Sequence, residues 1–127
     1  MRPRKDKTSA SRALDDRRLQ RVMQFIADNL QNDIRLKNLA EVANLSPFHF
    51  ARTFRKATGG SPHRYLRKCR LEKAKELLAE GQASLTDIAL TCSFSSQSSF
   101  TRAFTRATGI APGKYREICR PRSRKHP

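Results

Sequence analysis

The 127-residue chain carries 27 Lys and Arg residues against 11 Asp and Glu residues, a formal net charge of +16 at pH 7. No apolar run approaches the roughly 18–20 residues of a membrane span, and the basic first residues lack the apolar segment of a secretory signal. Basic residues still outnumber acidic ones between Ala13 and Gly113, so the predicted folded part is itself basic. We therefore expect a cytoplasmic protein with a polyanionic partner, most commonly nucleic acid, and no membrane binding.

In the first half of the chain, apolar spacing and Ser, Pro and Gly residues predict helices and their ends. A first helix is expected at about 15–30, and a shorter one at 36–43 with Leu36 on its buried face. After a turn at 44–46, Ser46 and Pro47 start a third helix, which ends at Thr58 and the following glycines. Ser61 and Pro62 then open a long helix to about residue 79.

The second half predicts the same order of elements. Ser84 caps a helix through Cys92, Ser95 or Ser96 caps another to Thr108, and a final short helix begins near Pro112. The sequence therefore predicts an all-α fold of about seven helices. We expect five segments: a basic flexible tail at 1–14, a first helix-turn-helix subdomain at 15–60, a linker helix at 61–80, a second helix-turn-helix subdomain at 81–120 and a basic disordered tail at 121–127.

These two halves form an internal repeat. LKNLAEVANLSPFHFARTFRKATGGSPHRY (36–65) matches LTDIALTCSFSSQSSFTRAFTRATGIAPGKY (85–115), with one extra residue in the second copy. The pairs include Phe50 with Phe100 and Arg52 with Arg102. A repeated unit of helix, short turn and helix favours a duplicated helix-turn-helix module over a solenoid, which needs more copies.

The second helix of each copy has a distinct outer face when residues are placed at 100° intervals. The predicted buried stripes are Phe50, Thr53, Phe54 and Ala57 in the first copy and Phe100, Ala103, Phe104 and Ala107 in the second. The predicted outer faces contain Phe48, His49, Arg52, Arg55 and Lys56 in the first copy and Gln97, Ser98, Ser99, Arg102, Thr105 and Arg106 in the second.

Several outer residues carry the chemistry of base recognition. Arg52 and Arg102 can each bind guanine with two hydrogen bonds, and Gln97 can bind adenine in the same way. Phe48 suits a thymine methyl group. The alternatives are a solvated or phosphate-binding charge for each arginine, local packing for Phe48 and a structural hydrogen bond for His49.

Other cations suit phosphate contacts, which set position but carry no base information. These residues are Arg55, Lys56, Arg64, Arg106 and Lys114. The backbone N–H groups at the helix starts near 36, 61, 84 and 112 could also bind phosphates.

The second unit, from Ser93 to Arg116, resembles the signature of the AraC/XylS family of bacterial transcription regulators, and the first unit resembles that family's N-terminal helix-turn-helix and linker helix. The resemblance covers about 16–120 and implies two recognition helices, at about 47–57 and 97–108, in successive major-groove segments of double-stranded DNA. It implies that the base-facing residues are Phe48, Ala51, Arg52, Gln97, Ser98 and Arg102. Ala51 departs from the longer polar residue often found at its position, so we expect the first unit to read fewer bases.

The resemblance also implies a sequence-specific regulator, more often an activator, that contacts RNA polymerase and acts at the nucleoid. Because the chain has no room for an effector domain, it looks like the small members that bind DNA as monomers. The alternatives are a nonspecific nucleic-acid-binding protein, a protein-interaction module or a DNA-binding fragment of a larger effector-responsive regulator.

The sequence contains no constellation that indicates an enzyme, a cofactor site or a metal centre. Cys69, Cys92 and Cys119 are widely spaced and lack the close Cys or His companions of a zinc site. We expect them to be small buried hydrophobes within helices.

Overall fold

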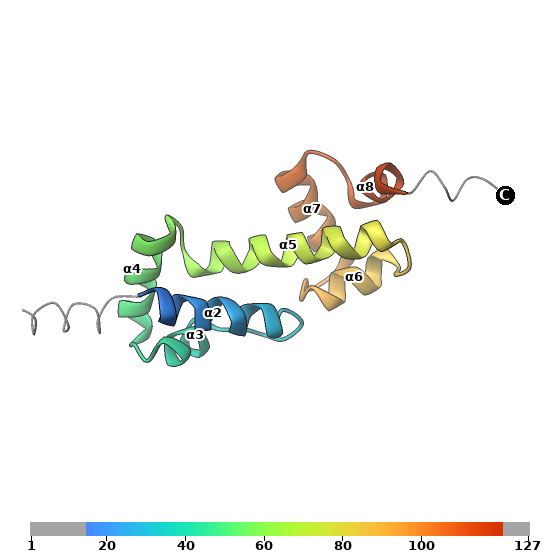
Figure 1. Ribbon diagram of the computed structural model, residues 1–127. Helices are drawn as coiled ribbons and strands as arrows, with labels where there is room; N and C mark the ends of the chain where they lie inside the picture. The colour runs from blue at the N-terminus through green and yellow to red at the C-terminus, as the bar shows by residue number, and fades with distance from the viewer. Residues whose placement is uncertain (1–14, 121–127) are drawn as a thin grey trace, which may run out of the picture. The chain divides into compact units, whose positions relative to one another are not determined.

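The computed structural model describes residues 15–120, which form seven α-helices and no β-strand (Figure 1). In the labels of Figure 1, these are α2 (Asp16–Asp28), α3 (Leu36–Ala43), α4 (Pro47–Thr58), α5 (Pro62–Glu80), α6 (Leu85–Thr91), α7 (Gln97–Thr108) and α8 (Pro112–Cys119). The predicted fold class, all-α with two helix-turn-helix units and a long helix between them, is confirmed. The two predicted tails, at 1–14 and 121–127, lie outside the described residues.

The described chain divides into two compact units, 15–67 and 68–120, and the division falls inside α5. The start of α5 therefore belongs to the first unit and the rest of this helix to the second. The five-segment organisation expected from the sequence remains a prediction.

Short polar side chains mark where the helices of the first unit begin and end. Asp15 accepts a hydrogen bond from the backbone N–H of Arg18 at 2.9 Å and so caps α2. Asn44 ends α3 in the left-handed conformation, with φ 60°. The Ser46 hydroxyl then accepts from the His49 N–H at 3.2 Å and caps α4. Asn44 and Ser46 therefore set where the turn between α3 and α4 begins and ends.

The core of the first unit lies between α2, α3 and α4. Val22, Ile26, Phe50 and Phe54 are fully buried. Aromatic contacts extend this core to α5, since the ring centroids of Phe54 and Tyr65 are 5.8 Å apart in an edge arrangement. The core side of α4 is thereby held in place, and its opposite side is left to solvent.

The second unit repeats this construction with its own core. Leu71, Ala74 and Leu78 of α5 are buried together with residues of α6 and α7. Phe104 stands between Phe100 and Tyr115, at centroid distances of 5.6 and 5.3 Å. Each unit therefore has two fully buried Phe residues in its core, Phe50 and Phe54 in the first and Phe100 and Phe104 in the second. These residues occupy equivalent positions of the repeat.

Helical spacing overestimated burial near several helix ends. Leu36, expected on a buried face, is 41% exposed because it is the first residue of α3 and lines an open hollow. Ala57 and Ala107, expected in the buried stripes, are exposed because each lies in the last turn, next to the end of its helix.

The cysteines and two helix ends also differ from the predictions. Cys92 is buried, as expected, but Cys69 and Cys119 are only half-buried. The first helix ends at Asp28, short of residue 30, because the Asn29 side chain donates to the Phe25 carbonyl at 2.8 Å. Cys92 follows α6 as its C-terminal cap and is not part of the helix.

Candidate nucleic-acid interface

The outer side of α4 presents an aromatic ring and a guanidinium group together. Phe48 is 72% exposed, so it is not a core residue. The guanidinium carbon of Arg52, one turn further along α4, lies 5.7 Å from the centroid of the Phe48 ring. This cation–π contact restrains a long side chain that would otherwise sample many rotamers. The pair therefore places an apolar ring and a guanidinium with five N–H donors next to each other on the outer side of α4.

Ala51 precedes Arg52 on α4 and is half-buried, so part of its side chain is accessible. Its methyl group can make van der Waals contact with a base, for example with a thymine methyl, but no hydrogen bond. Ala51 also borders a surface hollow of about 340 Å³. The hollow is lined by Ala51, Arg52, Arg55, Lys56, Ser61 and Pro62.

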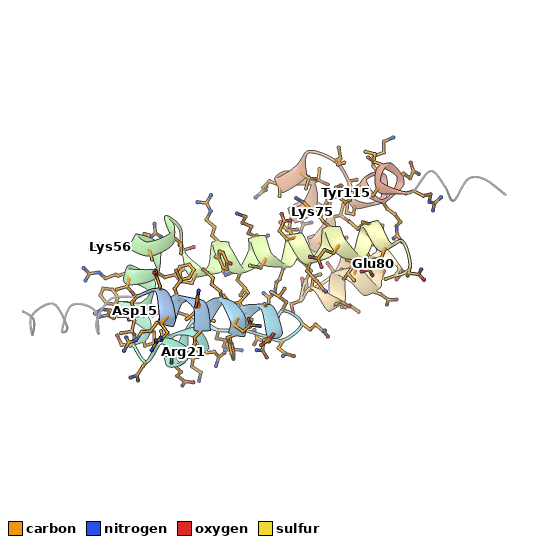
Figure 2. All side chains as sticks on the ribbon, viewed as in Figure 1. Asp15, Arg21, Lys56, Lys75, Glu80 and Tyr115 are labelled. Atoms are coloured by element: carbon orange, nitrogen blue, oxygen red, sulfur yellow. The ribbon has the colours of Figure 1, made fainter. Side chains whose placement is uncertain are left out.

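This hollow combines three cations of α4 with the first residues of α5. The Ser61 hydroxyl accepts from the Arg64 N–H at 3.1 Å and caps α5, so the positive end of the helix dipole faces the same region. Lys56 is marked on α4 in Figure 2. Such an arrangement suits a phosphate oxygen. The sequence separately predicted the cations and the start of α5, but not that they border one hollow.

The outer side of α7 presents polar groups and no aromatic ring. Gln97, Ser98 and Arg102 are all exposed, as predicted. Ser96 caps the helix by accepting from the Ser99 N–H at 3.1 Å. The Thr86 hydroxyl of α6 donates to Oε1 of Gln97 at 2.9 Å. Helical periodicity could not reveal this pair, because its members lie on two different helices.

The predicted phosphate-binding cations are exposed on four helices. Arg55 and Lys56 lie on α4, Arg64 lies in the first turn of α5, Arg106 lies on α7 and Lys114 lies on α8. Arg116 of α8 behaves differently, since it is half-buried and donates to the carbonyl oxygen of Ala83 at 2.7 Å. This guanidinium holds the start of α6 against α8, so one cation of the basic C-terminal region has a structural partner.

Within residues 15–120, no group of three His, Cys, Asp or Glu side chains is arranged to hold a metal ion. None of the helices described is long and apolar enough to cross a membrane. The buried Cys92 thiol has a pKa raised to about 11, because burial disfavours its thiolate. A raised pKa makes this cysteine a poor nucleophile at neutral pH.

Comparison with known protein families gives a match over most of the described chain. A family model described as a helix-turn-helix domain matches residues 39–118. The probable transcriptional regulator LumQ of Photobacterium leiognathi is 38% identical over 91 residues, which cover 68% of this chain and 37% of that protein. The transcriptional activator RhaS of Escherichia coli O139:H28 is 36% identical over 83 residues, which cover 65% of this chain and 30% of that protein. The match therefore spans 30% to 37% of the length of these relatives.

Solved structures show the same fold. The DNA-binding domain of AdpA, solved in complex with a target DNA, is 30% identical with a TM-score of 0.75, and the match covers 84% of this chain and 95% of that one. A probable AraC family transcriptional regulator from Rhodopseudomonas palustris is 26% identical with a TM-score of 0.73, and the match covers 84% of this chain and 100% of that one.

Proposed function

Because this chain belongs to the AraC/XylS family of helix-turn-helix transcription regulators, we propose that it binds double-stranded DNA sequence-specifically through α4 and α7. The two helices enter successive major-groove segments, about one helical turn apart. The observation that carries this proposal is the internal repeat: α4 and α7 occupy equivalent positions and bury equivalent Phe residues, yet their exposed faces differ. Two different faces on one chain read two different half-sites.

In the first unit, Arg52 binds a guanine through its two-pronged guanidinium, and Phe48 packs against a thymine methyl group. Ala51 adds a van der Waals contact to a base edge. The exposure of Phe48 and Arg52 and the 5.7 Å cation–π contact between them support the roles of these two residues.

In the second unit, Arg102 binds a second guanine, and Gln97 and Ser98 make further base contacts. All three side chains are exposed on α7, and Gln97 and Ser98 lie in its first turn, from which a recognition helix reaches base edges. The phosphate contacts come from Arg55, Lys56, Arg64, Arg106 and Lys114, which are exposed cations of α4, α5, α7 and α8.

The further proposal is that the chain activates transcription in the cytoplasm, at the nucleoid, as a monomer that contacts RNA polymerase. The relative RhaS, 36% identical, is named a transcriptional activator, which supports the sign of regulation. Two unlike recognition faces support binding as a monomer, because a symmetric dimer presents the same face twice. No cofactor or small-molecule effector is part of this proposal.

Selection of bound sites from a random duplex pool tests the specificity. Arg52→Ala and Arg102→Ala should each relax one half of the selected site, at a cost of about 1–3 kcal/mol of discrimination against the wrong base. Arg21→Ala is a charge-matched control, because Arg21 is an exposed arginine of α2 (Figure 2). This control should leave the consensus unchanged.

Two results would contradict the proposal. Selection without a consensus, together with affinity that falls steeply with salt, would indicate a nonspecific nucleic-acid-binding protein. Loss of preference at the same bases in both mutants would contradict two separate recognition helices.

Transcription in vitro with purified RNA polymerase, at a promoter carrying the selected site, measures activation directly, and unchanged transcript levels would reject the activator role.

A further inference from the structure

The outer side of α4 combines two apolar side chains with the guanidinium group of Arg52. Phe48 is 72% exposed, and Ala51 is half-buried. Residues three or four positions apart are neighbours on a helix, so Phe48 has both Ala51 and Arg52 beside it on one face of α4. The guanidinium carbon of Arg52 lies 5.7 Å from the centroid of the Phe48 ring. This face therefore offers an apolar contact directly beside a set of N–H donors.

Neither Phe48 nor Ala51 can distinguish bases by hydrogen bonds, because a phenyl ring and a methyl group carry no donor or acceptor of that kind. In the major groove, thymine presents the O4 acceptor and a methyl group on C5, whereas cytosine presents the N4–H donor. In 5-methylcytosine, the methyl group is attached to the same C5 atom as in thymine. Burying this methyl group against an apolar surface is favourable in either base. Phe48 and Ala51 therefore match the methyl group and not the thymine base as a whole.

We propose that the first unit recognises the C5-methyl group of a pyrimidine beside the guanine bound by Arg52, and therefore accepts 5-methylcytosine in place of thymine. This inference rests on the proposed function and names the chemical group that Phe48 and Ala51 contact. Its consequence is a further binding activity: methylation of a cytosine at this position raises the affinity of the protein for the site.

The second unit presents a different surface at the equivalent positions. Ser98 stands at the position of Phe48, and Thr101 stands at the position of Ala51. Both carry a hydroxyl group, which donates and accepts hydrogen bonds, and neither has an aromatic ring. The exposed ring of Phe48 therefore has no counterpart on α7, and the proposal assigns methyl recognition to α4 alone.

Selection from random duplexes with the parent and with Phe48→Ala locates the base pair concerned. The parent should select thymine, paired with adenine, at one position of the half-site read by α4, and Phe48→Ala should lose the preference there. The selected site is then synthesised in four forms that differ only at this position: T·A, U·A, 5-methylcytosine·G and C·G. Uracil is thymine without its methyl group. Each comparison, T·A with U·A and 5-methylcytosine·G with C·G, therefore isolates one methyl group while the opposite purine stays the same.

Equilibrium competition binding measures the affinity of the protein for the four duplexes. The T·A duplex should bind about 4-fold more tightly than U·A, and the 5-methylcytosine·G duplex about 4-fold more tightly than C·G, which is the effect of burying one methyl group. Phe48→Ala should remove most of both differences, and it should leave the fold intact because the ring is 72% exposed. Phe48→Leu keeps an apolar side chain and should retain part of both differences.

Lys56→Ala is the matched control on the same helix. Lys56 is an exposed cation of α4, and the proposed function assigns it to a phosphate. A phosphate contact carries no information about the base. Lys56→Ala should therefore lower the affinity for all four duplexes by the same factor and leave both methyl effects unchanged.

Four results would overturn the inference and leave the proposed function standing. The first is a specific consensus in which Phe48→Ala changes no position, or changes one that is not thymine. The second is equal affinity for T·A and U·A. The third is a 5-methylcytosine·G duplex that binds no more tightly than C·G, since recognition would then depend on thymine itself. The fourth is a Phe48→Ala variant that keeps both methyl effects. If the parent selects no consensus at all, the proposed function fails, and this inference fails with it.

Discussion

Replacing Arg116 by alanine tests whether a cation of this basic chain acts inside the fold and not on DNA. Its guanidinium donates to the Ala83 carbonyl at 2.7 Å, and the side chain is half-buried. A hydrogen bond from a charged donor contributes roughly 1.5–3 kcal/mol when buried. Because Arg116 is only partly shielded from water, we expect Arg116→Ala to lower the free energy of unfolding by about 1–2 kcal/mol.

Urea unfolding, followed by circular dichroism, measures this loss of unfolding free energy. DNA affinity measured over a range of salt concentrations shows whether Arg116 also contacts a phosphate. Arg116→Ala should keep the salt dependence of the parent. Lys114→Ala is the matched control: Lys114 is exposed on the same helix, so its loss should lower the salt slope by about one without changing stability. The reasoning is refuted if Arg116→Ala unfolds at the same urea concentration as the parent and loses salt dependence as Lys114→Ala does.

Three other predictions follow from burial and exposure. Phe104→Ala should lower the free energy of unfolding by about 3–5 kcal/mol, because it empties a fully buried site of the second core; a urea midpoint unchanged from the parent would contradict this. Phe48→Ala should change stability by less than about 0.5 kcal/mol, since the ring is 72% exposed, but should weaken specific DNA binding; the unfolding and binding curves together check both. Cys92, with a pKa raised to about 11, should resist alkylation at pH 8 in the folded protein. Its neutral thiol favours the folded state at low and neutral pH, and this contribution should be lost as the pH rises from about 9 towards 11, which unfolding across that range measures.

The helices could be predicted because local residues end them. Ser46, Pro47 and Gly59 act within a few residues of their own positions, through a cap, a fixed φ and a left-handed turn. The predicted outer position of Phe48 also follows from local geometry, since helical spacing alone places it opposite Phe50. Such signals need no knowledge of the rest of the fold.

Contacts between helices could not be predicted in this way. Thr86 and Gln97 are 11 residues apart, and Arg116 and Ala83 are 33 residues apart, so no helical period relates them. In the sequence, Arg116 counts as one more positive charge, and only its carbonyl partner reveals a structural role. For Ala57 and Ala107, helical spacing predicted burial that the structure does not show. Spacing along one helix does not reveal that the neighbouring helices no longer cover its last turn.

Under the proposed function, the two arginines at equivalent positions would give the two copies of the duplicated unit different specificities. Arg52 makes a cation–π contact with the exposed ring of Phe48, whereas the residue equivalent to Phe48 in the second unit is Ser98. In the proposed complex, the guanidinium restrained by this contact would lose less conformational freedom when it binds a base, and the apolar ring beside it would favour a thymine neighbour. Arg102 has small polar neighbours, so in the proposed complex the adjacent base would be read by other groups, such as Gln97. A site recognised by two such faces has no two-fold symmetry, and a chain that reads it binds in one direction only. For the activator role that we propose, this single direction is what would bring the same side of the protein towards RNA polymerase at every promoter that carries the site.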